Sequence, residues 1–333
     1  MKSIRNYIKY VKKNKLFMVI IGLIILAGFI HFIQKKEPFN EDADNLKIAI
    51  HTVFILKENL PFLEEWIQHH KKIGIDQFYL YDNTGSVVTN GSTTTNNRYG
   101  IHFDKLIKLD DNQLKQEMDK ILQKYPEITY IKWQPKTDEG KIHYGYKKSI
   151  DHYSKNYLQE NDWTIFIDID EFLYGDIIKQ NKLKQFISEN QNEFSKIMIK
   201  QRKYADRFCN IGKSINQISY MIINVETAGW AEKCIVKNKK LENSKTPEDK
   251  DGPMHSIGIK DGEETKWMNV NELCFNHYNV NKKQIDWMKG FFNKKSFKSG
   301  KDTENKYNTN INNENMFDLQ YYNQVKNDYC YQF

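Results

Sequence analysis

The sequence has few cysteines, and their spacing limits what they can do. Only four occur among 333 residues: Cys209, Cys234, Cys274 and Cys330. None forms a C-x-x-C pair, which excludes the zinc sites that are built on such pairs. An even number permits disulfide bonds in an oxidising compartment, but the pairing cannot be deduced from sequence, and buried reduced thiols are the alternative.

An excess of basic residues is also missing from most of the chain. The net charge is +7, but the first fifteen residues hold six basic side chains and no acid, so the remainder is near balance. A nucleic-acid-binding domain carries its positive charge on the folded part, and we therefore expect no nucleic-acid partner. Aromatic residues make up 14% of the chain, which indicates a folded protein rather than a disordered one.

One long apolar run occurs near the start of the chain, at residues 16–33. It contains no Asp, Glu, Lys or Arg, and as a helix it would extend roughly 27 Å, enough to cross the core of a bilayer. We predict an uncleaved transmembrane anchor, with a cleaved signal peptide as the alternative. Residues 1–15 would then form a basic cytosolic tail, and residues 34–45, which are polar, a stem. This is a single-pass type II arrangement with a lumenal domain.

The part from residue 46 onward alternates between strand and helix patterns. Leu63, Trp66 and Ile67 share one face of a helix. Pro61 can begin this helix and Gly74 can end it. The alternation predicts an α/β fold, in which a mostly parallel, mixed sheet is flanked by helices on both faces. We expect strands at residues 46–56, 76–82, 127–133, 162–170 and 195–204, and helices at residues 61–74, 112–124, 141–159 and 182–190.

Three acids follow the most apolar of these runs. In DWTIFIDIDEFLYG, Asp168, Asp170 and Glu171 come at the end of the strand predicted at residues 162–170. Residues two apart in a strand point the same way, so Asp168 and Asp170 would project together beyond its carboxyl end. Converging carboxylates repel one another unless a cation lies between them, and oxygen ligands suit Mg²⁺ or Mn²⁺. The pattern predicts a divalent metal site, with a solvated acidic loop as the alternative.

A second predicted strand also ends in polar residues. Asp82 and Asn83 follow the run FYLY. In open α/β sheets ligands bind beyond the carboxyl ends of the strands, so these two residues are candidates for holding the ribose or base of a nucleotide. An ordinary Asx turn is the alternative. The glycosylation acceptor sequence NGS at Asn90 lies in the polar stretch that follows, which predicts a surface loop.

These motifs together resemble glycosyltransferase family 92 and its glycosyltransferase-2-like relatives. The resemblance covers about residues 47–292. It implies a GT-A-like (Rossmann-like) fold in a type II membrane protein of the Golgi or an equivalent secretory membrane. It also implies inverting transfer of a sugar, with galactose as the leading candidate, from a UDP-sugar or similar donor to a glycan or other glycoconjugate, with Mn²⁺ or Mg²⁺ as cofactor. The matching residues are Lys57, Glu65, Trp66, His70, Gly74, Tyr81, Asp82, Asn83, Asp168, Asp170, Glu171, Phe172, Lys233, His277 and Tyr278.

The resemblance implies roles for individual residues. Asp168 would lie near the ribose and the metal, and Asp170 would bind the metal. His277 would be a further metal ligand or a phosphate contact, with a structural histidine as the alternative. Lys57 or Lys233 would touch a phosphate as a point charge, and solvated surface lysines are the alternative.

The chain departs from the family pattern in two places. The family's K-N-E is K-E-N here, which moves to Glu58 the acid expected to hold the base or ribose. The family's W-x-x-F-G stretch, which would contribute to the choice of acceptor, is absent after the D-x-D-E-F motif.

Transfer that inverts the configuration of the sugar requires a general base that takes the proton of the acceptor hydroxyl. Glu226 and Glu232 are the candidates, with Asp206 behind them. His255 is a candidate substrate contact, or else part of a plain turn. Three tryptophans could stack on a sugar, although packing in the core is the usual role of this residue: Trp163, Trp230 and Trp287.

The boundaries of the domain follow from these patterns, and two other functions stay open. Residues 46–300 would form the glycosyltransferase domain and residues 301–333 a C-terminal extension. A non-catalytic carbohydrate-binding protein could keep the same fold, and the exchanged K-E-N favours it. A metal-dependent phosphodiesterase also uses paired aspartates, but it would need clustered His and Asp ligands, whereas the nine histidines here are scattered.

Overall fold

The structure is a computed structural model, which describes residues 41–84, 86, 109–140, 142–205, 221–223, 232–242 and 257–280. The chain divides into two compact units, Met1–Asp42 and Ala43–Phe333. The short helix α2 (Glu41–Asn45) lies at this boundary, and all elements below belong to the second unit. Within the described ranges no helix is long and apolar enough to cross a membrane. The predicted tail, anchor and C-terminal extension lie outside these ranges.

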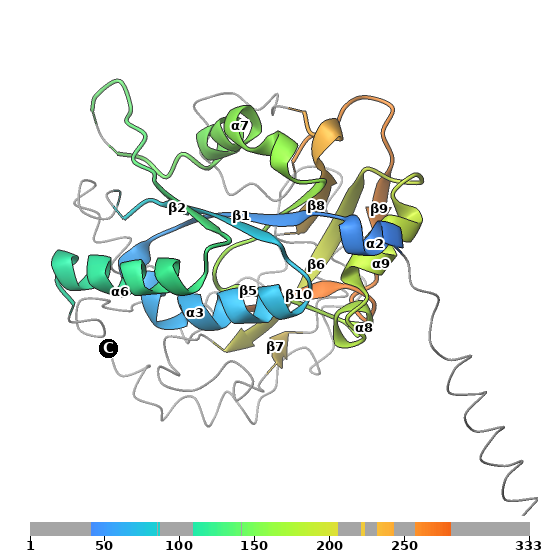
Figure 1. Cartoon of the computed structure of the whole chain (residues 1–333), viewed down its shortest axis with the longest axis horizontal. Helices are drawn as coiled ribbons and strands as arrows, with labels where there is room; N and C mark the ends of the chain where they lie inside the picture. The colour runs from blue at the N-terminus through green and yellow to red at the C-terminus, as the bar shows by residue number, and fades with distance from the viewer. Residues whose placement is uncertain are drawn as a thin grey trace, which may run out of the picture. The chain divides into compact units, whose positions relative to one another are not determined.

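A curled, mixed sheet forms the centre of the second unit (Figure 1). β3, β2, β1 and β4 are parallel, β8 runs antiparallel between β4 and β6, and β10 lies parallel to β6 and antiparallel to β5. The predicted α/β fold with a mostly parallel sheet is confirmed. In spatial order the strands are β3 (Ile128–Lys132), β2 (Gln77–Asp82), β1 (Ile48–Phe54), β4 (Trp163–Phe166), β8 (Lys233–Lys237), β6 (Lys196–Ala205), β10 (Cys274–Val280) and β5 (Glu171–Tyr174), with β7 (Met221–Ile223) and β9 (Thr265–Trp267) also paired to β6.

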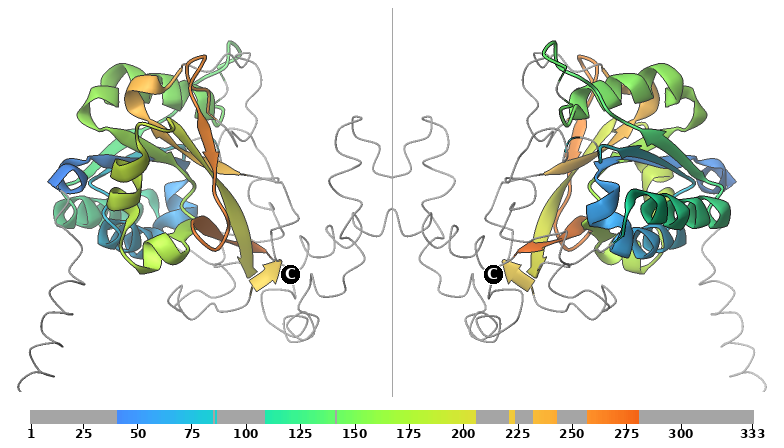
Figure 2. Two further views of the ribbon diagram at one scale, coloured as in Figure 1. Left: turned by 90° about the vertical axis from the view of Figure 1, so that its right-hand side faces the viewer. Right: turned by 90° about the vertical axis from the view of Figure 1, so that its left-hand side faces the viewer.

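Helices cover both faces of the sheet (Figures 1 and 2). α7 (Tyr146–Asn156) lies on one face, and two 3₁₀ turns, Leu158–Glu160 and Asn238–Lys240, follow α7 and β8. The opposite face is covered by α3 (Leu56–Lys72), α6 (Asp111–Lys124), α8 (Asp176–Lys179) and α9 (Leu183–Asn190).

Each face of the sheet has its own core. On the face that α3 covers, the core includes three fully buried residues of this helix, Leu63, Trp66 and Ile67. They pack in one cluster with Ile50 and Phe78 of the sheet. The predicted apolar face of this helix is therefore confirmed. The core beneath α7 is rich in tyrosine, and it includes Tyr79, Tyr81, Tyr146 and Tyr153.

The two ends of α3 compare differently with the sequence prediction. The helix begins at Leu56 rather than at Pro61, so that prediction was wrong. A proline so near the start removes few helical hydrogen bonds, and the start is held from outside, because the Leu56 N–H donates to side-chain oxygens of Asp82 and Thr84. At the other end Gly74 has a φ of +98°, and the helix closes in a Schellman motif. The prediction that this glycine ends the helix is confirmed.

Other helix boundaries have local causes. The helix predicted at residues 141–159 is shorter because Gly145, with a φ of +60°, directly precedes α7. A Cβ on Gly145 would lie 2.3 Å from Cγ of Pro135, so only glycine fits at this point. α6 begins one residue earlier than predicted, where Asp110 and Gln113 form a capping box.

Candidate functional site

The acidic motif forms a turn between β4 and β5, rather than the end of a strand. β4 stops at Phe166, where its pairing with β1 and β8 stops. The chain then turns, and the Glu171 N–H donates to the Asp168 carbonyl at 3.1 Å. The prediction that residues 162–170 form one strand, with Asp168 and Asp170 on the same side of it, was wrong. The chain reverses here because β5 pairs antiparallel with β10.

Lys233 neutralises one side of this turn. It is the first residue of β8, which pairs antiparallel with β4. Its Nζ lies 2.6 Å from Oδ2 of Asp168 and 3.3 Å from Oε2 of Glu171. Lys233 and Glu171 are buried, whereas 35% of the Asp168 side chain is exposed. The lysine predicted as a phosphate contact is thus placed directly beside the acidic motif.

Burial and charge together set the protonation of this group. Burial raises the pKa of Glu171 to about 8, with the charge of Lys233 opposing the shift and those of Asp168 and Asp170 adding to it. Burial alone would lower the pKa of Lys233, but the charges of Asp168 and Glu171 outweigh it and hold this pKa well above its ordinary value. Lys233 therefore stays charged, with Asp168 as its closest carboxylate, while Glu171 can hold a proton near neutral pH.

Asp170 lies on the other side of the turn, against His277 of β10. Its Oδ2 is 3.3 Å from Nε2 of His277, and its carbonyl accepts from the Tyr278 N–H at 3.0 Å. The second ring nitrogen, Nδ1, is 2.9 Å from Oε1 of Gln201. In the tautomer that has its proton on Nδ1, this nitrogen donates to the amide oxygen of Gln201 and Nε2 presents its lone pair, whereas a second proton on Nε2 would donate to Asp170. A lone pair on one nitrogen and a hydrogen bond from the other is the arrangement typical of metal-binding histidines.

A divalent cation shared with a substrate stays a prediction for these side chains. The structure brings together two of the predicted ligands, Asp170 and His277, but pairs the third, Asp168, with Lys233. Within the part of the chain that is described, no three His, Cys, Asp or Glu side chains converge so as to hold a metal by themselves. Mg²⁺ is usually bound through one or two carboxylates together with substrate phosphates, and two protein ligands suffice for that.

The polar end of β2 is built differently. Asp82 is buried, and its carboxylate accepts hydrogen bonds from the N–H of Leu56 at 3.3 Å, the N–H of Thr84 at 3.0 Å, the hydroxyl of Tyr130 at 2.6 Å and the hydroxyl of Thr84. Asn83 is also buried, and its amide donates to two carbonyls in the segment between β3 and α7. The Asx turn, which was the alternative for this segment, is therefore present. A nucleotide contact at Asp82 stays a prediction.

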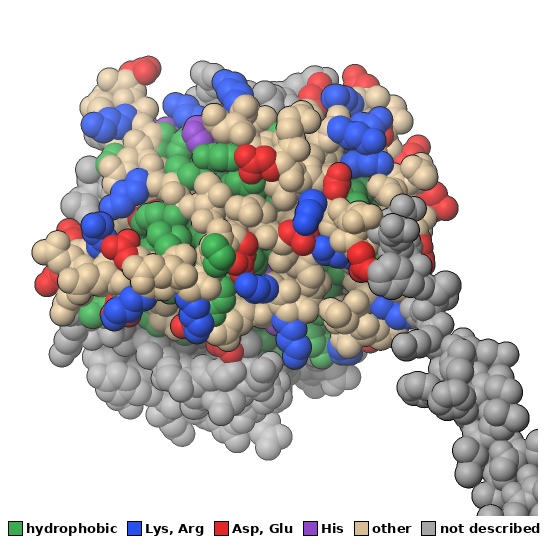
Figure 3. Space-filling view, viewed as in Figure 1, with side chains coloured by type: hydrophobic (Ala, Val, Ile, Leu, Met, Phe, Trp, Pro, Cys, Tyr) green, Lys and Arg blue, Asp and Glu red, His purple; other side chains and the backbone are tan. Residues whose placement is uncertain are grey.

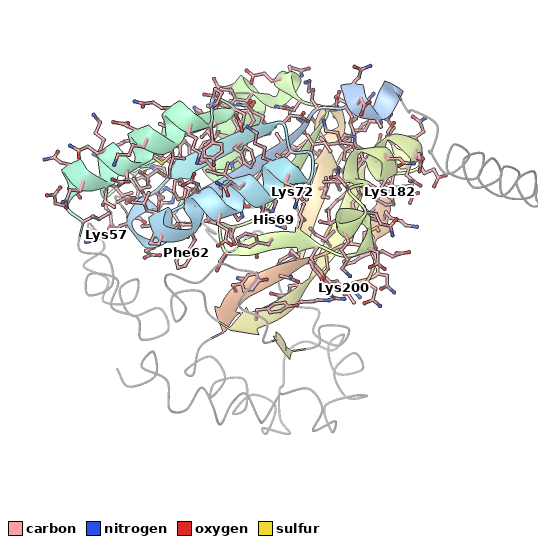
Figure 4. All side chains as sticks on the ribbon, turned by 60° about the horizontal axis from the view of Figure 1, so that its bottom comes forward. Lys57, Phe62, His69, Lys72, Lys182 and Lys200 are labelled. Atoms are coloured by element: carbon pink, nitrogen blue, oxygen red, sulfur yellow. The ribbon has the colours of Figure 1, made fainter. Side chains whose placement is uncertain are left out.

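The predicted donor contacts Lys57 and Glu58 lie in the first turn of α3, directly after β1. Figure 4 shows Lys57 at the opposite end of this helix from Lys72. Lys233 lies at the same edge of the sheet, because antiparallel β8 begins where β4 ends. All three residues therefore come from the edge at which β1 and β4 end.

The remaining candidates divide into those that can be placed and those that cannot. Glu232 directly precedes Lys233 at the start of β8. Trp163 is fully buried, which confirms a core role. Cys234 and Cys274 are buried free thiols. The others lie outside the described residues, namely Glu226, Asp206, His255, Trp230, Trp287, Asn90, Cys209 and Cys330.

Three residues near the turn carry no motif that would have identified them. Gln201 of β6 hydrogen-bonds the ring of His277. Tyr146 begins α7 with a buried hydroxyl that has no hydrogen-bond partner among the described atoms. His51 of β1 is buried among aromatic rings, and burial lowers its pKa to about 3, so it is neutral. Each owes its position to neighbours that are distant in the sequence.

The surface seen in Figure 3 carries charges of both signs. Basic and acidic side chains are intermixed over the helices that face the viewer. The expectation that nucleic acid is not a partner stays a prediction.

Comparison with known proteins gives no family assignment. No family model matches the sequence, and a search of curated proteins finds no significant match. The resemblance to glycosyltransferase family 92 therefore rests on the motif residues and stays a prediction.

Proposed function

We propose that residues 46–300 form a metal-dependent glycosyltransferase with a GT-A-like fold. The observation that carries this proposal is the turn after β4, where Asp170 meets His277 and Lys233 meets Asp168. The turn follows the carboxyl end of a parallel strand, which is where open α/β sheets bind their ligands. The parallel strands β3, β2, β1 and β4, followed by antiparallel β8, are compatible with the fold that the resemblance implies.

The residues of the turn divide the work of holding a nucleoside diphosphate. Asp170 and His277 would hold Mn²⁺ or Mg²⁺, which when bound neutralises the charge that develops on the leaving diphosphate. Lys233 supplies a second positive charge, and its contacts to Asp168 and Glu171 hold the ammonium in place. A charge that is already positioned stabilises a developing anion without having to reorganise first.

The other parts of the proposal rest on the resemblance. The donor is a UDP-sugar, with galactose as the leading candidate, and the acceptor is a glycan or another glycoconjugate. Transfer inverts the sugar, with Glu226 or Glu232 as the base. The chain is a type II protein of the Golgi or an equivalent secretory membrane, anchored by residues 16–33.

One observation favours a second function. The ion pair between Lys233 and Asp168 already neutralises part of the turn without a cation. This arrangement would suit a non-catalytic carbohydrate-binding protein that keeps the fold. The two functions differ in the fate of the donor, because only the enzyme releases UDP.

Release of UDP from UDP-galactose and related donors tests the proposal, with the full-length chain in detergent and with or without Mn²⁺. We expect release that depends on the metal and falls about 100-fold or more in Asp170→Asn, since one charge that stabilises the leaving group is lost. Asp176→Asn is the matched control, because Asp176 is an exposed acid of α8 that pairs with Lys179.

Two results would contradict the proposal. Tight binding of UDP-sugars with no release in Mn²⁺ would support the non-catalytic function. Equal turnover in Asp170→Asn and Asp176→Asn would remove Asp170 from the site.

A further inference from the structure

A tyrosine ring is fixed at the carboxyl edge of β1. The segment between β3 and α7 extends away from the sheet (Figure 1) and returns at Tyr144, whose hydroxyl donates to the carbonyl of Val53 at 2.6 Å. Val53 is the next-to-last residue of β1. The next residue, Gly145, is itself held in place, because its carbonyl accepts from Nε1 of Trp133 at 3.1 Å and a larger residue would collide with Pro135. The Tyr144 ring is thus held at its hydroxyl, and the backbone directly after it is held at Gly145.

This ring is also exposed. Among the described residues, Tyr144 and Trp267 are the large hydrophobic side chains that stay exposed, at 38% and 54%. The Tyr144 ring is stacked on the buried ring of Tyr146, with an interplanar angle of 15° and centroids 6.3 Å apart. A flat apolar surface that is rigid and faces solvent is a surface on which a planar ligand can stack.

Tyr146 connects this ring to the acidic turn. It packs in the same core cluster as Phe166, where β4 ends, and Cys234, which follows Lys233. Burial raises the pKa of Tyr146. The charge of Lys233 is close enough to oppose this rise, and the charge of Asp168 is close enough to add to it. A ligand that extended from Tyr144 past Tyr146 would therefore have its charged end near the turn that Lys233 neutralises.

We propose that Tyr144 is the stacking platform for the base of the nucleotide donor, with the diphosphate held at Lys233 and the turn after β4. This inference rests on the proposed function. A base fits better than an acceptor sugar, because Tyr144 is anchored on β1, at the edge where parallel strands bind nucleotides. Stacking on one aromatic ring tolerates different bases, so the ring supplies affinity for the nucleoside rather than selection among bases.

Isothermal titration calorimetry tests the inference on the full-length chain in detergent with Mn²⁺. The two ligands are UDP, which has a base, and inorganic pyrophosphate, which has none. In Tyr144→Ala we expect UDP to bind about tenfold more weakly or worse, and pyrophosphate to bind as in the wild type. Tyr144→Leu, which keeps apolar bulk without the flat ring, should behave in the same way. Tyr144→Phe keeps the ring and should lose little.

Trp267→Ala is the matched control, because it removes the other exposed ring, on β9. Unchanged binding of both ligands is expected there. If Tyr144→Ala and Tyr144→Leu bind UDP as the wild type does, the inference fails while the transferase proposal stands. Equal weakening of UDP and pyrophosphate would also overturn it. If the wild type binds neither ligand, both the inference and the proposed function fail.

Discussion

Two neighbouring regions at one edge of the sheet carry acids where a strand ends, and these acids have different partners. Asp82, at the end of β2, is buried among uncharged donors, which are backbone N–H groups and hydroxyls. After β4, Asp168 faces the ammonium of Lys233 and Asp170 faces the imidazole of His277. These two side chains keep contact with solvent, with exposed fractions of 35% and 26%.

We infer from this difference that the partners of an acid indicate its role better than its position at the end of a strand does. The Asp82 carboxylate accepts hydrogen bonds from uncharged donors. One of these donors is the backbone N–H of Leu56, so Asp82 anchors the start of α3. Charged or titratable partners can be exchanged for a cation or a phosphate while the charge stays balanced. We therefore expect the chemistry at the turn after β4, and a contribution to stability from the end of β2.

The largest effect that would test this contrast is expected at Lys233. Lys233→Met leaves Asp168 and the buried Glu171 without their compensating charge, and breaking a buried ion pair costs about 3–5 kcal/mol. We expect a loss near the lower end of this range, about 3 kcal/mol, because Asp168 keeps contact with water and Glu171 can take up a proton. The free energy of unfolding in urea measures it.

Lys184→Met is the control for this loss. Lys184 pairs with Asp76 at 2.8 Å, and both side chains are partly exposed, so a loss below about 1 kcal/mol is expected. The double variant with Glu171→Gln should recover part of the stability lost in Lys233→Met. Equal losses in Lys233→Met and Lys184→Met would show that Lys233 is an ordinary surface partner.

A smaller effect is expected at Asp82. Asp82→Ala removes one of the two acceptors of the Leu56 N–H and leaves the hydroxyls of Tyr130 and Thr84 without their acceptor, which should cost about 2 kcal/mol. At a temperature where the variant is folded, KM for the UDP-sugar should be unchanged. Asp110→Ala, which removes the local cap of α6, is the control and should cost about 1 kcal/mol. A raised KM in Asp82→Ala would make Asp82 a donor contact and would remove the contrast between the two regions.

The first half of the sheet could be predicted from the sequence because its elements are local. β1, α3 and β2 follow one another directly, and each buries a continuous face, so strand and helix periodicities are visible in the chain. β5, β8 and β10 were not predicted as strands, because they are short or carry polar residues. Their pairing partners are distant in the sequence, as in the pairing of β8 with β4.

The site could be predicted only in part for the same reason. The resemblance implied that Asp170 and His277 bind the same metal. In the structure, Oδ2 of Asp170 lies 3.3 Å from Nε2 of His277. The ion pair of Lys233 with Asp168 depends on β8 running antiparallel beside β4, which no local pattern specifies. The position of Tyr144 depends likewise on the return of the segment before α7 to the end of β1.

Titration of Mn²⁺ followed by electron paramagnetic resonance, with UDP present, tests most directly whether Asp170 and His277 share a cation. The full-length wild type should bind Mn²⁺ tightly once UDP is present, since the diphosphate completes the site. Asp170→Asn should weaken this binding by more than about tenfold, while Asp82→Ala leaves it unchanged. Equal Mn²⁺ affinity in the wild type and in Asp170→Asn would contradict a cation held at the turn after β4.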